Sequence, residues 1–160
     1  MAGLTLDAGA LIAFERNDRR LVALIARSHA HGDSLAVPAG VVGQVWCDGR
    51  RQARLARLLG SAGVRIESLD DHRAREAGQL CGVSGTTDVI DASVVLCARV
   101  HGHHIATSDP DDIRRLDPAV PIIRVQRNAR EGRLVTSDRR RPARRQNPCR
   151  VWSSARRLAS

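Results

Sequence analysis

Short apolar runs alternate with longer segments of helical spacing along the first 126 residues. The short runs, rich in Leu, Val and Ile, predict five strands, at Leu4–Leu6, Ser34–Val37, Val64–Leu69, His104–Thr107 and Ile122–Val125. Apolar residues three and four apart predict helices over Ala8–Phe14, Asp18–Ser28, Val41–Leu59, Asp70–Leu80, Asp88–Val100 and Pro110–Leu116. Because strand and helix alternate throughout, we expect an α/β fold with a mostly parallel sheet and helices on both faces.

Glycines and threonines indicate where these elements end. Gly49 is expected to divide the long segment 41–59 into two pieces. Residues 82–85 include two glycines and are predicted to form a loop, after which Thr86 or Thr87 caps the next helix. Gly102 is expected to end that helix.

The alternation stops at Arg127, and the charge balance changes there too. Residues 1–126 hold 15 Arg and 15 acidic residues, whereas residues 127–160 hold 11 Arg and 2 acidic residues, which accounts for the whole net charge of +9. We therefore predict a domain over 1–126 and an Arg-rich, disordered tail over 127–160. The tail has three interpretations: a phosphate-binding arm, a solvated extension without function, or an out-of-frame read-through.

The composition excludes several function classes. All 26 basic residues are Arg, so a P-loop ATPase, a kinase of the usual type and a Schiff-base enzyme are excluded, because each needs a lysine amine. Aromatic residues make up only 2% of the chain. This scarcity argues against a base-stacking RNA-binding sheet, and Trp46 is interpreted as a packed anchor.

The cysteines and the apolar runs bear on location. Cysteines at positions 47, 81, 97 and 149 form neither a CxxC pair nor a small disulfide framework. We therefore expect reduced, mostly buried thiols and a cytoplasmic protein. No run of about 18 apolar residues and no leader-like start is present, so a membrane span is not expected.

Four aspartates are expected to meet at one edge of the sheet. Asp7 follows the first predicted strand and Asp109 the fourth, and sites in such sheets form at the carboxyl ends of strands. Asp88 and Asp91 are three residues apart and share a helix face. Carboxylates gathered in this way repel one another unless a cation lies between them. Carboxylate oxygens suit hard ions such as Mg²⁺ or Mn²⁺, which promote hydrolysis of phosphodiesters.

Three segments carry a family resemblance. Residues 6–12 (LDAGALI), 87–92 (TDVIDA) and 106–112 (ATSDPDD) resemble, in order and spacing, a PIN domain of the VapC toxin type. The resemblance covers about residues 3–126. It implies a three-layer α/β/α fold and a metal-dependent endoribonuclease acting on RNA. It also implies a cognate antitoxin that blocks the site, and a homodimer.

The resemblance also implies roles for single residues. Asp7 matches the first acid of the PIN pattern, Asp88 the central one and Asp109 the last, and these would hold the metal. Asp91 lies one turn further on and is a candidate fourth ligand. Gln44 stands where the family usually has a Glu, so the site would lack one charge that Asp91 would supply.

Three other interpretations stay open. Without a Glu at position 44, the chain could be a catalytically weakened PIN-like domain that binds RNA or antitoxin. A response-regulator-like domain that accepts phosphate on Asp7 is disfavoured, because such receivers use a lysine. A zinc site is also disfavoured, since Gly102 marks an ordinary helix end near the candidate ligands Cys97, His101, His103 and His104.

Smaller expectations concern side chains near the site and on the surface. Thr107 or Ser108 is expected to orient a water or to form a hydrogen bond at the strand end. Four arginines are predicted either to contact RNA phosphates or to be solvated: Arg50, Arg51, Arg54 and Arg57. An apolar helix face is expected to face the core or a dimer partner: Leu21, Leu24 and Ile25.

Overall fold

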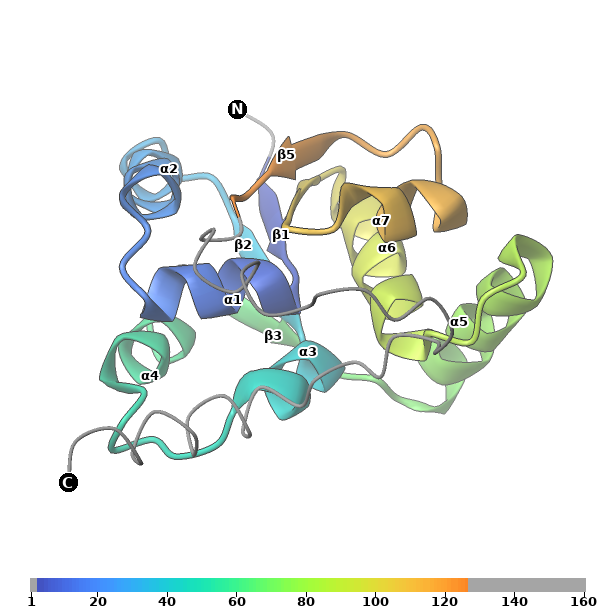
Figure 1. The fold of residues 1–160 in the computed structure, drawn as a ribbon, viewed down its shortest axis with the longest axis horizontal. Coiled ribbons are helices and arrows are strands. Elements are labelled where there is room, and N and C mark those ends of the chain that lie inside the picture. The colour runs from blue at the N-terminus through green and yellow to red at the C-terminus, as the bar shows by residue number, and fades with distance from the viewer. Residues whose placement is uncertain (1–2, 127–160) are drawn as a thin grey trace, which may run out of the picture.

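The computed structural model describes residues 3–126, and the predicted tail over 127–160 lies outside this part of the chain. The described residues form one sheet of five parallel strands (Figure 1). The strands are β1 (Leu4–Leu6), β2 (Leu35–Pro38), β3 (Val64–Glu67), β4 (His104–Thr107) and β5 (Ile122–Arg124). The predicted α/β class and parallel sheet are therefore confirmed.

The strand order, β3-β2-β1-β4-β5, places the first strand in the centre. From β1 the chain moves outward to β2 and β3, and it then returns to build β4 and β5 on the other side. The gap between β1 and β4 is therefore the point where the winding reverses. In open parallel sheets, binding crevices form at this point, outside the carboxyl ends of the strands.

Seven helices surround the sheet in residues 3–126. They are α1 (Ala8–Glu15), α2 (Arg19–Ala30), α3 (Ala39–Val45), α4 (Ala53–Leu59), α5 (Asp71–Ser84), α6 (Val89–His101) and α7 (Pro110–Leu116). In Figure 1, α1, α2 and α4 lie on one side of the sheet, whereas α5, α6 and α7 lie on the other. Helix α3 follows β2 and contacts both α1 and α6. The result is the predicted three-layer α/β/α arrangement.

Burial on both faces explains the apolar central strands. Leu4, Leu6, Leu35, Val37 and Ile105 have no exposed surface. Burial of each such side chain stabilises the fold by about 1.5–3 kcal/mol. The same logic explains α2: its buried residues include Leu21 and Ile25, so most of the predicted apolar face belongs to the core.

The predicted break near Gly49 is confirmed, because α3 ends at Val45 and α4 begins at Ala53. The predicted loop over 82–85 is wrong, because α5 continues to Ser84 and ends at Gly85, whose φ is +66°. A glycine inside a helix costs only about 1 kcal/mol relative to alanine. Packing of α5 against α6, which buries Ala77 and Cys81, outweighs that cost.

Other expectations are met in part. Trp46 is 41% exposed rather than packed in the core. Cys81 and Cys97 are buried free thiols, as predicted, but Cys47 is disulfide-bonded, so that prediction is wrong for it. Cys149 lies outside the described residues. Between residues 3 and 126, no single helix is long and apolar enough to cross a membrane, although α5 and α6 together pass that test as a pair bent by 107°.

Candidate active site

Asp7 lies where β1 ends, at the point where the winding of the sheet reverses. It is the N-cap of α1: its Oδ1 accepts a hydrogen bond of 2.6 Å from the backbone N–H of Ala10. Its own N–H donates to the carbonyl of Ala106 in β4 at 3.2 Å, which holds the residue beside the neighbouring strand. Only 8% of Asp7 is exposed.

Thr107 connects Asp7 to the end of β4. Its side chain is fully buried and hydrogen-bonds to the Asp7 carboxylate. The same hydroxyl oxygen accepts a bond of 2.9 Å from the N–H of Asp109. The expected strand-end hydrogen bond therefore exists, and Thr107 rather than Ser108 forms it with its side chain. Close packing accompanies it, because a Cβ at Gly9 would overlap the Ser108 side chain.

Asp88 and Asp91 begin α6. Asp88 is the N-cap, and its Oδ1 accepts a bond of 2.9 Å from the N–H of Asp91. The prediction that Thr86 or Thr87 caps this helix is wrong. Asp88 caps it instead, while the Thr86 hydroxyl accepts a bond of 3.3 Å from the N–H of Asp88. Both carboxylates are favoured here by the positive end of the helix dipole.

The pKa of Asp7 is influenced by its burial, by its hydrogen bonds and by the charge of Asp91. The pKa of Asp7 is raised to about 6, mainly by burial and to a smaller extent by the negative charge of Asp91. Hydrogen bonds from Thr107 and from the N–H groups of Ala10 and Ser108 lower it and offset part of this rise. Within residues 3–126, Asp7 forms no ion pair. Asp7 is thus a buried carboxylate that also feels the negative charge of Asp91.

The Cys81 thiol is affected by the charges of Asp88 and Asp91. The pKa of the Cys81 thiol is raised by its burial and by the charges of Asp88 and Asp91. Cys81 lies in α5, so this helix packs its last turns against the start of α6. Negative charge is therefore concentrated around the first turn of α6.

Electrostatic interactions and hydrogen bonds link the four predicted aspartates, although not all of them to one another. Asp91 interacts with Asp7 and is bonded to Asp88, while Asp109 is joined to Asp7 through Thr107. In the described part of the chain, no three Asp, Glu, His or Cys side chains form a group that could hold a metal ion. Carboxylate oxygens are nevertheless the donors that hard divalent ions prefer. The donor chemistry therefore fits such an ion, and the metal-binding roles stay predictions.

Gln44 and Gln52 lie on either side of the break between α3 and α4. Gln44 is half-buried in α3, and its role stays a prediction. Gln52 is buried: its Oε1 accepts bonds from the N–H groups of Cys47 and Asp48 at 2.7 and 3.0 Å, and its Nε2 donates to the Val45 carbonyl at 2.8 Å. Sequence analysis missed Gln52, because a lone glutamine carries no pattern.

The alternative zinc ligands have other partners. His103 is buried, and its two ring nitrogens lie 3.2 Å from the Thr5 hydroxyl and 2.8 Å from the Ser34 hydroxyl. His101 lies 2.9 Å from a carboxylate oxygen of Glu67. These residues form no zinc-like group in residues 3–126, so they serve as hydrogen-bonding groups between strands and helix.

Comparison with known proteins rests on structure alone, because no family model and no curated protein matches the chain. A chain of the VapBC2 complex from Rickettsia felis, bound to a promoter DNA fragment, matches with a TM-score of 0.58 and 12% identity, covering 77% of this chain and 98% of that one. FitAcB from Neisseria gonorrhoeae matches with a TM-score of 0.52 and 18% identity, covering 74% and 95%. The fold is PIN-like.

A third PIN-like structure is Mycobacterium tuberculosis VapC20, described as a toxin that cleaves the sarcin–ricin loop. It matches with a TM-score of 0.51 and 19% identity, covering 64% of this chain and 87% of that one. The predicted resemblance to VapC-type PIN domains is therefore confirmed at the level of the fold. In this PIN-like fold, Asp7, Asp88 and Asp109 each occupy the N-cap of a helix.

Proposed function

We propose that the chain is a divalent-metal-dependent endoribonuclease and the toxin of a toxin–antitoxin pair. The observation that carries this proposal is the buried Asp7 carboxylate, which lies where the winding of the sheet reverses and within electrostatic range of Asp91. A buried carboxylate in the electrostatic range of a second carboxylate is costly to ionise, and a cation bound to it would offset that cost. The PIN-like fold and the description of VapC20 as an RNA-cleaving toxin support the choice of reaction.

The proposed ion is Mg²⁺ or Mn²⁺, held by Asp7 and Asp91 with Asp88 and Asp109. When bound, it supplies Lewis-acid stabilisation of a phosphate and lowers the pKa of water. The residues of the chain do the rest. Thr107 holds the Asp7 carboxylate in place, and the carboxylates would supply the oxygen ligands and more than neutralise the ion's two positive charges.

The proposed partners follow from the same function. RNA is the substrate, and the arginines expected to contact its phosphates are all exposed: Arg50, Arg51, Arg54 and Arg57. Two of the matched structures carry names of toxin–antitoxin complexes, VapBC2 and FitAcB, which supports a cognate antitoxin for this chain. A homodimer and a cytoplasmic location complete the proposal.

The test is cleavage of a structured RNA by the full chain, with Mn²⁺ and with EDTA. We expect cleavage only with Mn²⁺ and a loss of at least about a hundredfold in rate for Asp7→Asn, which keeps an N-cap side chain but removes the charge. The matched control is Asp70→Asn, an exposed N-cap of α5 that should retain the wild-type rate. Cleavage that survives both EDTA and Asp7→Asn would refute the proposal.

A second candidate function rests on Gln44, which supplies no charge where PIN domains of this type usually have an acid. In this case the chain binds RNA or antitoxin without cutting RNA. The Gln44→Glu variant separates the two functions. A binding module should stay inactive or gain cleavage only with the new acid, whereas the proposed nuclease is already active with Gln44.

A further inference from the structure

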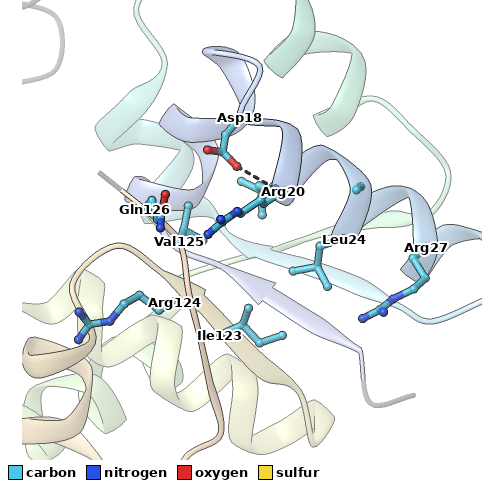
Figure 2. A pocket seen from close by; sticks show the side chains of 10 residues that line it. Asp18, Arg20, Leu24, Arg27, Ile123, Arg124, Val125 and Gln126 are labelled. Atoms are coloured by element: carbon cyan, nitrogen blue, oxygen red, sulfur yellow. Dashed lines mark hydrogen bonds between the residues drawn. The ribbon is translucent and has the colours of Figure 1, made fainter. Parts of the chain in front are cut away.

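An apolar groove lies between α2 on one side and β5 with the two residues after it on the other. Its volume is about 420 Å³. Leu21 and Leu24 of α2 line it from one side, and Ile123 and Val125 from the other; in Figure 2, Leu24 and Ile123 point toward one another. Leu24 and Ile123 are only half-buried. Covering these side chains would remove further apolar surface from water.

Positively charged side chains also line this apolar groove. Arg20, Arg27 and Arg124 line the groove together with one acid, Asp18. The Asp18 carboxylate caps α2 by accepting a bond of 2.9 Å from the N–H of Leu21. All three arginines are exposed, and none forms an ion pair with another residue of the described range 3–126. The lining therefore carries two excess positive charges.

The positive charge and apolar surface of the groove indicate which kind of molecule could bind there. The segment 127–160 of the same chain holds 11 Arg and 2 acidic residues, so its net positive charge disfavours it as the occupant. A second copy docking by the same face would bring like charges together. RNA satisfies the arginines, but the lining offers no aromatic face on which bases could stack.

We propose that the groove docks a segment of a separate protein in which Leu, Ile or Val side chains are interspersed with Asp or Glu. The apolar side chains would fill the floor, and the carboxylates would meet the arginines. Arg20 and Arg27 are seven residues apart on α2, so they lie about 10 Å apart along the helix axis. Two turns of a partner helix, or about three extended residues, span that distance.

A random dodecapeptide library displayed on phage tests this proposal on the full chain. Selection against wild type, with counter-selection on Leu24→Arg, should enrich peptides that combine carboxylates with aliphatic side chains. A synthetic copy of an enriched peptide should bind at least about tenfold more weakly to Leu24→Arg and to Arg20→Glu/Arg27→Glu. Added salt should weaken binding to wild type.

Two variants control for substitution elsewhere on the surface. Val83→Arg places the same side chain at an exposed position of α5, and Arg115→Glu reverses an exposed charge on α7. Both should bind the peptide as wild type does. Arg20 and Arg27 are exposed, so the double charge reversal keeps the fold and remains decisive if Leu24→Arg does not fold.

Several results would overturn the proposal. These are a failure to enrich peptides, enrichment of peptides without carboxylates, or binding that is unaffected by both groove variants. A wild-type dimer that Leu24→Arg converts to a monomer in sedimentation would assign the groove to a second copy. Loss of binding to a single-stranded RNA oligonucleotide in Arg20→Glu/Arg27→Glu would assign it to RNA. RNA cleavage has no part in these measurements, so they are independent of the proposed nuclease.

Discussion

Asp7 is a buried carboxylate at the C-terminal end of the central strand β1. Its folded-state pKa of about 6 lies above the ordinary value of 3.8. The folded protein therefore binds the proton more tightly than the unfolded chain does. The linkage relation then states that stability is lost as pH rises from about 4 to about 6. At neutral pH, the metal-free protein bears the full cost of the ionised side chain.

Replacing Asp7 by Asn should relieve this cost while keeping the N-cap. In EDTA at about pH 7.5 we expect Asp7→Asn to raise the free energy of unfolding by ~1–3 kcal/mol, with no gain at about pH 4. Urea denaturation at the two pH values measures this, and the exposed cap variant Asp70→Asn is the control. Added Mn²⁺ should stabilise wild type but not Asp7→Asn. A variant no more stable than wild type at pH 7.5 would contradict the account.

Thr107 offers a second prediction at this scale. Its hydroxyl donates to the Asp7 carboxylate and accepts from the N–H of Asp109. Thr107→Val removes both bonds at nearly constant volume, so the pKa of Asp7 should rise further, and stability should fall by ~1–3 kcal/mol. Thr107→Ser should restore both properties. An NMR titration of the Asp7 carboxyl carbon measures the pKa, and an unchanged value in Thr107→Val would remove Thr107 from its positioning role.

At the scale of elements, side-chain hydrogen bonds to backbone groups, both local and distant in sequence, help to fix where helices start and stop. Gln52 satisfies three backbone groups in the turn between α3 and α4. Glu15 of α1 accepts a bond of 2.6 Å from the N–H of Leu55, in the first turn of α4, which has no side-chain cap of its own. Helix α4 is therefore anchored by its neighbours rather than by a local motif.

The buried amide of Gln52 gives the prediction for this scale. Gln52→Leu leaves the N–H groups of Cys47 and Asp48 and the Val45 carbonyl without their partner, so we expect a loss of ~2–4 kcal/mol in unfolding free energy. The matched control is Gln79→Leu at an exposed position of α5, which should change stability little. A loss no larger than that of the control would show that the turn is held by other contacts.

Apolar periodicity was enough to predict all five strands and the order of the helices. It could not predict that α5 passes through Gly82, since tertiary packing against α6 decides that. Nor could it choose Asp88 over Thr86 as the cap, because both residue types are good caps and only the local chain path separates them. Asp7 was found because it follows the first apolar run, whereas Gln52 follows no pattern at all.

At the scale of the whole molecule, topology brings the acids together. Asp7 and Asp91 are 84 positions apart in the sequence, yet they interact because α6 returns the chain to the central strand β1. The groove between α2 and β5 also joins segments that are far apart in the sequence, because α2 comes before strand β2 whereas β5 is the last strand. The domain itself has no net charge, so binding depends on local charge.

Diffraction from crystals grown with Mn²⁺ would show whether one divalent ion binds among these carboxylates. We expect an anomalous difference peak in contact with carboxylate oxygens of Asp7 and Asp91 that is absent from crystals of Asp7→Asn. A wild-type crystal with no peak at this edge of the sheet, at a Mn²⁺ concentration that supports RNA cleavage, would contradict it.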